Sequence, residues 1–319
     1  MNNSRVPILS IEELTTCFTL DNGQILTACD SVTLPLYKGE TLGIVGESGC
    51  GKSTLVRTAL QLERATSGKV LYQGTDLLKL HGSDLRKSRK HIQMIFQNPS
   101  TAFNPSMLVR DIVTEPLRNF GMLESKQIDE KAKELLAMVN LPESFLYRYP
   151  HAMSGGQRQR LGIARALSIE PDIVICDEVT SALDVSVQDK ICRLLAQLQK
   201  EKGMSYLFIC HDLALVDMMA HQVAVMYLGN VVEYIDGKRF NRNTVLHPYT
   251  QALLSSVFDV YANSWELTSL PGEIPSPIDL PSGCPFSSRC SQCSERCMLE
   301  KPVLREVSPG HKVACHLIR

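Results

Sequence analysis

One stretch near the start of the chain constrains it more than any other, because it fits the pattern G-x-x-x-x-G-K-[S/T] of a phosphate-binding loop. The stretch reads Gly46-Glu47-Ser48-Gly49-Cys50-Gly51-Lys52-Ser53. Residues 40–45 before it are typical of a buried strand, and residues 54–62 after it predict a helix. Inward-turned N–H groups and the positive end of that helix would form a cradle for phosphate oxygens. This strand–loop–helix context predicts a nucleotide site.

Two side chains of the loop indicate how a nucleotide would be held. Lys52 is expected to reach the β- and γ-phosphates of ATP, and the hydroxyl of Ser53 is expected to bind Mg²⁺. We predict that the loop and the residue after it bind the nucleotide. These residues are Gly46, Glu47, Ser48, Gly49, Cys50, Gly51, Lys52, Ser53 and Thr54.

Composition limits where such a protein would act. The 319 residues suffice for one large core or two domains, and 33 Lys and Arg nearly balance 34 Asp and Glu. A net charge of −1 gives no general attraction for nucleic acid or for an anionic membrane. No apolar run approaches the roughly 18 residues of a membrane span, and no signal-peptide core follows residues 1–5. We therefore expect a cytosolic chain that meets a membrane only through another protein.

The first segment predicts a β-hairpin, with strands at residues 8–14 and 32–36 and a turn signal at Asp21-Asn22-Gly23. Phe18 precedes the turn. Its ring could stack on an adenine or simply pack in the hairpin, and the residues alone leave both interpretations open.

Three further features follow the loop. Gln97 ends a strand-like run at residues 91–97, where its amide could contact Mg²⁺ or the attacking water. Residues 108–120 and 125–141 have the spacing of core-facing helices and predict a helical insertion. Ser154 would cap the next helix, and Gly155 and Gly156 keep side chains away from its start, so this turn is a candidate second anion site.

Two later strands end in polar residues. The run at residues 173–178 ends in Asp177, a candidate Mg²⁺ ligand, and Glu178, which could polarise a water toward the γ-phosphate. Solvated acids at a strand end are the alternative. The strand at residues 206–210 ends at His211, a candidate sensor of the γ-phosphate or merely a satisfied polar residue. A helix is expected between them, over residues 186–200.

Taken in order, the loop, Gln97, M-S-G-G-Q, I-C-D-E and His211 resemble the ATP-binding subunits of ATP-binding-cassette (ABC) transporters over residues 8–237. In that family two cassettes close head to tail around two ATP molecules. The resemblance therefore implies that one short segment serves the nucleotide of the partner cassette, and that Asp184 lies in a loop that contacts this partner. The segment consists of Ser154, Gly155, Gly156 and Gln157.

The resemblance also assigns roles at the chain's own site. Phe18 would stack on adenine, and Gln97 would couple the nucleotide to the helical segment and the membrane subunits. Mg²⁺ would be held by Ser53, Gln97 and Asp177, and the catalytic residues would be Lys52, Glu178 and His211.

The sequence departs from the family at two positions. Met153 replaces the usual Leu, which conserves volume, and Val179 replaces the usual Pro, which removes no catalytic group. Because the catalytic set is complete, we expect this chain to hydrolyse ATP.

The C-terminal part resembles oligopeptide and dipeptide permease ATPases at residues 246–254 and 270–276. Four cysteines follow with the spacing C-x5-C-x6-C-x17-C, which in those relatives implies a [4Fe–4S] cluster. They are Cys284, Cys290, Cys297 and Cys315. Four thiolates also suit Zn²⁺, and Cys293 forms a C-x2-C pair that favours zinc, while plain reduced thiols are a third alternative. Because this tail is Pro-rich, we expect a structural metal to staple it.

The sequence thus predicts an α/β P-loop ABC cassette at residues 6–240, with an antiparallel β subdomain and a helical insertion at about 100–160. A small metal-stapled extension would cover residues 241–319. The predicted function is ATP-driven uptake of di- and oligopeptides. Nickel or metal-chelate import and a soluble non-transport cassette are the alternatives.

The resemblance also implies an assembly. The expected partners are a second ABC ATPase, taken to be a paralogue, two transmembrane permease subunits and an extracytoplasmic substrate-binding protein, with no nucleic acid. The chain would lie peripherally at the cytoplasmic face of the cell membrane.

Overall fold

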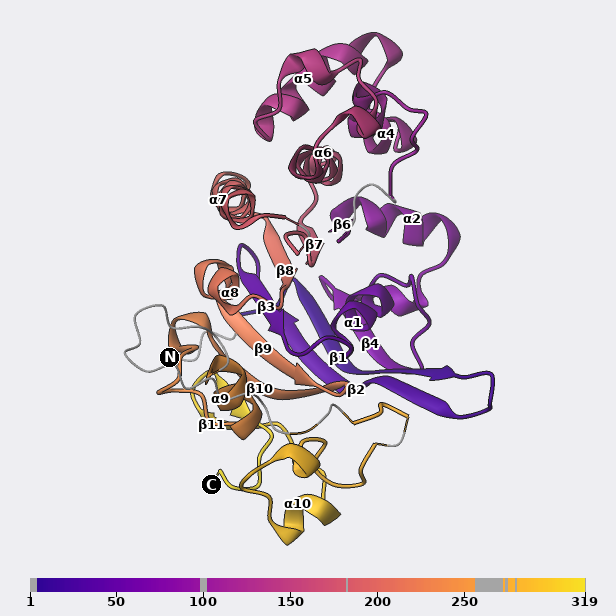
Figure 1. The fold of residues 1–319 in the computed structure, drawn as a ribbon. Helices are drawn as coiled ribbons and strands as arrows, with labels where there is room; N and C mark the ends of the chain where they lie inside the picture. The colour runs from indigo at the N-terminus through magenta and orange to yellow at the C-terminus, as the bar shows by residue number, and fades with distance from the viewer. Residues whose placement is uncertain are drawn as a thin grey trace. The chain divides into compact units, whose positions relative to one another are not determined.

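The computed structural model describes residues 5–97, 102–181, 183–255, 272, 275–278 and 280–318. It comprises two compact units, one formed by Met1–Lys79 with His211–Arg319 and the other by Leu80–Cys210. We call them unit 1 and unit 2, and Figure 1 traces the chain through both. Among the described residues, no helix combines the length and apolarity that a membrane span requires.

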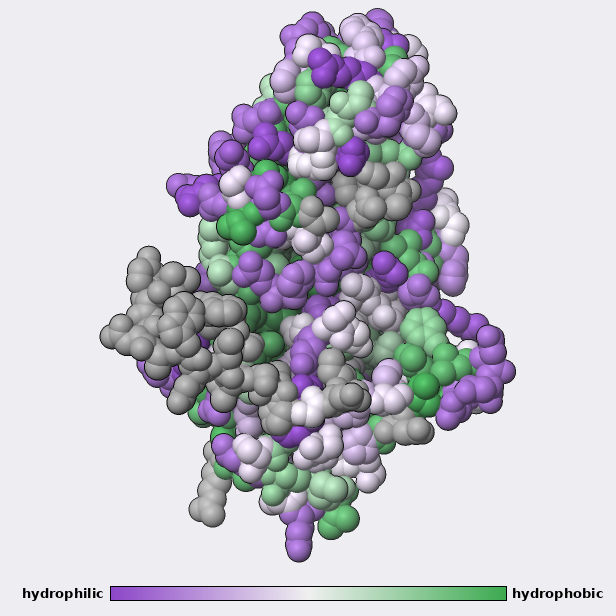
Figure 2. All heavy atoms as spheres, in the orientation of Figure 1, coloured by the Kyte–Doolittle hydropathy of each residue, from purple (hydrophilic) through white to green (hydrophobic). Residues whose placement is uncertain are grey.

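Unit 1 begins with an antiparallel sheet in the order β2-β1-β4-β5. Its strands are β1 (Leu9–Thr19), β2 (Ile25–Leu36), β4 (Ser67–Tyr72) and β5 (Thr75–Asp76). The predicted hairpin is confirmed, and its strands are longer than the apolar runs indicated. At its turn, the N–H of Leu20 donates to the carbonyl of Gln24 over 2.9 Å. Figure 2 shows an apolar patch beside the projecting end of this hairpin. Ile25, which begins β2, is 58% exposed.

A second group of strands in unit 1 follows the order β11-β12-β10-β9-β3. The strands are β3 (Thr41–Val45), β9 (Gln222–Tyr227), β10 (Asn230–Asp236), β11 (Arg305–Ser308) and β12 (His311–Val313). β3 is buried along its whole length and pairs in parallel with β9, whereas β10 and β12 are antiparallel to their neighbours. This arrangement fixes the end of β3, from which the phosphate-binding loop starts.

Short helices complete unit 1. The α-helices are α1 (Lys52–Ala59), α8 (Leu213–Met219), α9 (Pro248–Ser255) and α10 (Glu295–Leu299), and the 3-10 helices are η1 (Leu77–Lys79), η5 (Gly237–Arg239) and η6 (Ser287–Arg289). The predicted helix after the loop begins at Lys52 rather than at residue 54, so Lys52 and Ser53 form its first turn.

Unit 2 contains three parallel strands and the helices around them. The strands are β6 (Ile92–Ile95), β7 (Ile173–Asp177) and β8 (Ser205–Ile209), and β7 pairs with both of the others. Two helices accompany them, α2 (Gly82–His91) and α7 (Val185–Lys202). Every residue of β7 and β8 is buried, as expected for central parallel strands. The carboxyl ends of β6 and β7 therefore lie side by side.

The helical insertion also belongs to unit 2. It contains α4 (Val109–Asn119), η2 (Ser125–Gln127), α5 (Ile128–Met138), η3 (Glu143–Phe145), η4 (Pro150–Ala152) and α6 (Gly155–Leu167). α4 packs against both α5 and α6. Fully buried residues such as Val113, Leu136 and Leu161 form this small core, which confirms the helical periodicity in the sequence.

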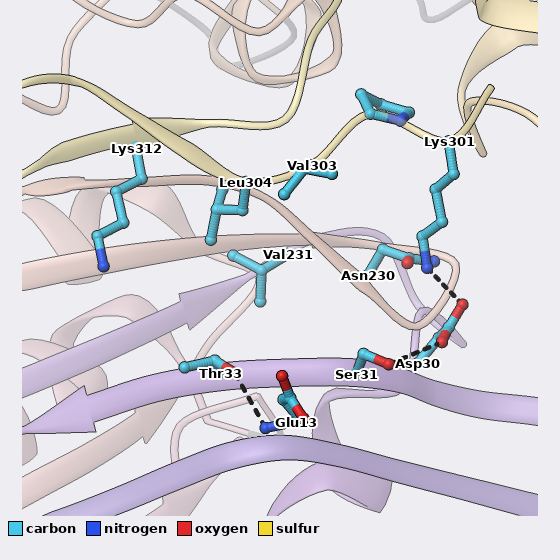
Figure 3. Close-up of a pocket in the computed structure, with 11 residues that line it drawn as sticks. Glu13, Asp30, Ser31, Thr33, Asn230, Val231, Lys301, Val303, Leu304 and Lys312 are labelled. Carbon is cyan, nitrogen blue, oxygen red and sulfur yellow. Dashed lines mark hydrogen bonds and ion pairs between the residues drawn. The ribbon is translucent and has the colours of Figure 1, made fainter.

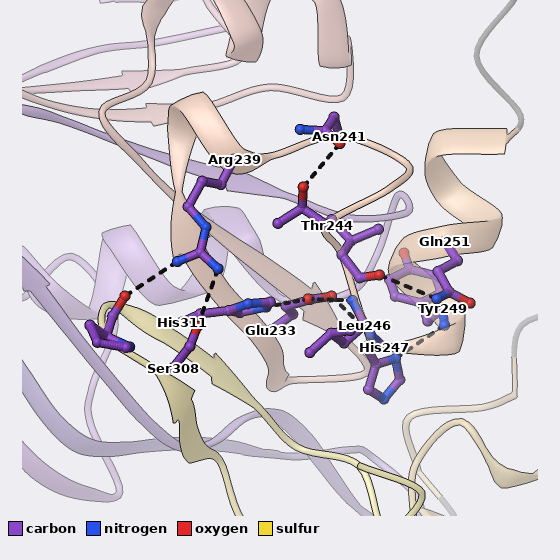
Figure 4. Close-up of polar contacts among 12 residues, drawn as sticks. Glu233, Arg239, Asn241, Thr244, Leu246, His247, Tyr249, Gln251, Ser308 and His311 are labelled. Atoms are coloured by element: carbon purple, nitrogen blue, oxygen red, sulfur yellow. Dashed lines mark hydrogen bonds and ion pairs between the residues drawn. The ribbon is translucent and has the colours of Figure 1, made fainter. Parts of the chain in front are cut away.

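The C-terminal extension is held to unit 1 by protein contacts. Strand β12 pairs with β10, with Glu233 opposite Val313. The carboxylate of Glu233 is fully buried and accepts hydrogen bonds from the N–H groups of Leu246 (2.8 Å) and His247 (3.1 Å). Its third partner is Nε2 of His311, at 2.7 Å (Figure 4). These contacts join residues 246–247 and strand β12 to β10.

Candidate functional site

The phosphate-binding loop of unit 1 takes a shape that only glycine allows at two positions. Gly46 has φ 151° and Gly51 has φ 102°, which are backbone conformations that side chains disfavour. A Cβ on Gly46 would lie 2.2 Å from the carbonyl oxygen of Met226. On Gly51 it would lie 2.1 Å from the carbonyl oxygen of Ala28. At these two glycines the loop is thus wedged against neighbouring backbones.

Lys52 lies within this loop and is only 4% exposed. Its ammonium donates hydrogen bonds to the carbonyls of Gly46 (2.8 Å) and Glu47 (2.9 Å). The loop carbonyls therefore hold the charge at the start of α1, where the helix dipole is also positive. Buried positive charge, glycine turns and a helix start together suit the phosphates of a nucleotide.

Two other predicted residues lie in unit 1. Phe18 is half-buried on β1 opposite Leu26, and β1 is joined to α1 by a hydrogen bond between the hydroxyls of Thr16 and Thr58 at 3.1 Å. His211 is exposed directly after β8.

Gln97 and Glu178 meet in unit 2. The amide of Gln97 donates to the Glu178 carboxylate over 2.7 Å and to the Ser181 hydroxyl over 3.3 Å. Ser181 in turn donates to the backbone carbonyl of Glu178 at 3.0 Å. Because β6 and β7 are parallel neighbours, both side chains emerge from the same end of the strands. The sequence prediction that they share a site is consistent with this contact.

The backbone at Glu178 is also strained. Glu178 has φ 48°, which is unusual for a residue with a side chain and costs about 1 kcal/mol or more. The preceding Asp177 ends β7 and is 3% exposed. The turn therefore directs two adjacent carboxylates differently, one into the protein and one toward Gln97.

The segment from Ser154 to Gln157 starts helix α6 with a reciprocal cap. The Ser154 hydroxyl accepts from the N–H of Gln157 (3.3 Å), and the Gln157 side chain accepts from the N–H of Ser154 (2.9 Å). Gly156 has no room for a side chain, since a Cβ would lie 2.9 Å from a methyl group of Val187. Ser154 and Gly155 are exposed, so another molecule can reach this helix start.

The cysteine cluster does not form a metal site in the part of the chain that the structure describes, which includes all five of these cysteines. No three His, Cys, Asp or Glu side chains there are arranged to hold a metal ion. The metal-stapled extension is therefore not supported by the structure.

Two residues that contact the phosphate-binding loop were not predicted from the sequence. The hydroxyl of Tyr249 accepts a hydrogen bond from the N–H of Glu47 at 2.9 Å, and Arg289 forms an ion pair with the Glu47 carboxylate. The segment at residues 246–254 stood out by resemblance, but nothing in the sequence indicated what it would touch.

Comparison with known proteins matches both parts of the chain to described families. Residues 29–181 match "ABC transporter", and residues 232–297 match "Oligopeptide/dipeptide transporter, C-terminal region". The sequence is 49% identical to the oligopeptide transport ATP-binding protein AppF of Bacillus subtilis, over 91% of this chain and 89% of that protein. It is 46% identical to the oligopeptide transport ATP-binding protein OppF of Salmonella typhimurium, over 98% of this chain and 96% of that protein.

Solved structures agree on the fold. A dimeric ATP-binding cassette in a post-hydrolysis state, bound to ADP and Pi, superposes with a TM-score of 0.66 at 28% identity. The match covers 72% of this chain and 99% of that cassette.

Proposed function

Because the chain belongs to the ABC transporter ATPases and carries the C-terminal region of oligopeptide and dipeptide transporters, we propose that it hydrolyses ATP to drive peptide uptake. The observation that carries this proposal is the near full-length match to oligopeptide transport ATP-binding proteins, which includes the extension. The wedged glycine loop with its buried Lys52 supports nucleotide binding from the structure itself.

The proposed chemistry uses the residues that the family resemblance assigns to the chain's own nucleotide site. Lys52 neutralises phosphate charge, and Ser53, Gln97 and Asp177 would hold Mg²⁺, which would supply further positive charge at the phosphates. Glu178 orients the attacking water, and His211 steadies the γ-phosphate. Phe18 stacks on the adenine in this proposal. The hydrogen bond from Gln97 to Glu178 supports the assignment, since it fixes the direction of the carboxylate that would accept a proton.

We further propose that catalysis requires a second cassette. The exposed start of α6 would bind the γ-phosphate of ATP held by that partner, which we take to be a paralogue. Two permease subunits and an extracytoplasmic binding protein would complete the importer. The chain would then lie at the cytoplasmic face of the membrane.

Peptides are the proposed cargo because the named relatives are oligopeptide transport proteins. Import of nickel or another metal chelate would leave every residue assignment above unchanged. A soluble cassette that never meets a membrane is the more distant alternative.

The test is the ATPase rate of the complex isolated from native membranes with this subunit tagged. Short peptides with the matching binding protein should stimulate hydrolysis, and nickel chelates should not. Glu178→Gln should keep ATP binding and lower turnover by about 100- to 10,000-fold, because the general base is lost. Glu170→Gln is a matched control: Glu170 has a similar φ of 51° but pairs with Lys202.

Each outcome separates one part of the proposal. Retained turnover in Glu178→Gln would refute its role as the base. Stimulation by chelates alone would change the cargo, and a tagged subunit that brings down no membrane subunits would favour the soluble cassette.

The metal prediction has its own test. We expect anaerobically purified protein to contain about four iron and four sulfide per chain if the [4Fe–4S] resemblance holds. One zinc without sulfide would identify a zinc site instead. Absence of both metals would agree with the described arrangement of the cysteines and remove the cofactor from this proposal.

A further inference from the structure

Two residues of the C-terminal extension, Tyr249 and Arg289, contact Glu47 of the phosphate-binding loop. Arg289 approaches the Glu47 carboxylate with two nitrogens, one 2.7 Å from Oε2 and the other 3.1 Å from Oε1. The hydroxyl of Tyr249 accepts a hydrogen bond from the backbone N–H of the same residue at 2.9 Å. Both the side chain and the backbone of Glu47 are therefore held from outside the loop, by residues about 200 or more positions later in the chain.

The ion pair has the geometry of a strong contact. A two-pronged pairing of guanidinium and carboxylate fixes direction as well as distance, because two parallel bonds form at once. The Arg289 side chain is only 4% exposed, and the Glu47 side chain is 21% exposed, so water screens the pair little. Arg289 also lies over the ring of Tyr227, with its guanidinium carbon 5.8 Å from the centroid. Contacts with Glu47 and with the ring of Tyr227 thus fix the position of the Arg289 side chain.

Tyr249 is held just as firmly. Its ring is fully buried among Tyr227 and Phe286, with centroid distances of 4.7 and 5.5 Å. Its N–H donates to Nδ1 of His247 over 3.1 Å, and the N–H of His247 donates to the buried carboxylate of Glu233. Figure 4 shows this chain of contacts, which starts at His311 on β12. A strand of the extension is thereby linked through successive hydrogen bonds to the phosphate-binding loop.

The extension also forms an ion pair with β2 that does not involve the loop. Lys301 forms an ion pair with Asp30 of β2, at a pocket with a volume of about 550 Å³ (Figure 3). Both side chains of this pair are partly exposed, at 41% and 32%. The described residues thus include an Arg289–Glu47 ion pair at the loop and a Lys301–Asp30 ion pair that can be cut without touching the loop.

We propose that Arg289 and Tyr249 are positioning residues of the ATP site, which hold Glu47 so that the loop keeps its phosphate-binding shape before ATP arrives. The inference rests on the proposed function as an ATPase. It assigns to the extension a part in nucleotide binding, in addition to any contact with membrane subunits. Since a preset loop needs little reordering, removing either contact should weaken binding of ATP.

The experiment uses the full chain for MgATP affinity and the isolated complex for KM and kcat. Tyr249→Phe removes one oxygen and leaves the ring, and Arg289→Gln removes the charge. Each should raise the dissociation constant and KM by about fivefold to twentyfold, with kcat changed less than about twofold, because binding alone is affected. Lys301→Gln, which cuts the attachment away from the loop, should leave affinity and KM at the wild-type values.

A double-mutant cycle tests whether Arg289 acts through Glu47. Glu47→Gln combined with Arg289→Gln should raise KM no more than Arg289→Gln alone, since both remove the same contact. If Arg289→Gln does not fold, Tyr249→Phe decides the question.

Two results overturn the inference. One is wild-type affinity in Tyr249→Phe, and the other is an equal loss of affinity in Lys301→Gln, which would reflect general destabilisation. A wild-type chain that binds no ATP would instead refute the proposed function, so the two failures are distinguishable.

Discussion

At the scale of single residues, the loop depends on positions where any side chain is excluded. Gly51 combines φ 102° with a backbone oxygen 2.1 Å from where its Cβ would lie. Gly23, in the hairpin turn, has φ 80° but no atom within 4 Å. A substitution at Gly23 therefore tests backbone strain alone, whereas a substitution at Gly51 tests strain together with steric exclusion.

We predict that Gly51→Ala lowers the free energy of unfolding by more than about 3 kcal/mol, because strain and overpacking add. Gly23→Ala should lower it by only about 1–2 kcal/mol, the cost of a left-handed conformation. Urea denaturation of both variants measures the difference. Equal losses would show that the backbone around Gly51 adapts.

The sequence predicted some residue contacts and missed others for a physical reason. Gln97 and Glu178 were both assigned to one nucleotide site by the resemblance to ABC ATPases, and a hydrogen bond joins their side chains. Arg289 and Tyr249 gave no such signal. Their partner Glu47 lies more than 200 positions away, and no local periodicity encodes a tertiary contact of that kind.

At the scale of elements, the start of α6 combines two requirements. Ser154 caps the helix through Gln157, and the same exposed turn is our candidate for the phosphate of the partner cassette. A helix cap accepts hydrogen bonds from N–H groups, whereas a phosphate site must present N–H groups to an anion. Substitution can distinguish these roles.

We predict that Ser154→Ala lowers stability by about 1 kcal/mol because the cap is lost. Ser154→Asp should keep near wild-type stability, since Asp caps equally well, but should abolish ATPase activity of the complex because its charge repels phosphate. Thermal unfolding and ATPase assays on the same preparations provide the comparison. Full activity in Ser154→Asp would restrict Ser154 to capping.

Elements with strong periodicity were predictable, and short ones were not. β7, β8 and the helices of the insertion follow apolar patterns, so their existence could be predicted, with boundaries shifted by a few residues. β11 and β12 have four and three residues and no alternation long enough to detect. β12 pairs with the edge that β10 offers, and that tertiary contact is not encoded in the local sequence.

At the scale of the molecule, stability depends on a buried polar network under the extension. His247 is almost fully buried, and desolvation lowers its pKa to about 3. Its Nδ1 accepts the N–H of Tyr249, so the ring is bound in its neutral form. In an unfolded chain the same histidine would have a pKa near 6.5.

We therefore predict that stability falls as the pH drops from about 6.5 toward 3. In this window the unfolded chain binds a proton that the folded chain does not, and the loss is about 1.4 kcal/mol per pH unit. His247→Asn, which can still accept a hydrogen bond, should flatten this part of the curve. Chemical denaturation at pH 7, 6, 5 and 4 measures both slopes, and identical slopes would exclude His247 as the source.

The discontinuity of unit 1 has a consequence for biosynthesis. A ribosome that adds about 5–20 residues per second needs on the order of 10–50 s to travel the 242 positions from Glu47 to Arg289. In the sequence, the residues of unit 2 lie between these two positions, so they are all synthesised in this interval. They also precede β9, the strand with which β3 pairs. The phosphate-binding loop is thus synthesised early, but its contacts with Tyr249 and Arg289 form last. A product of interrupted translation therefore lacks the residues that hold Glu47.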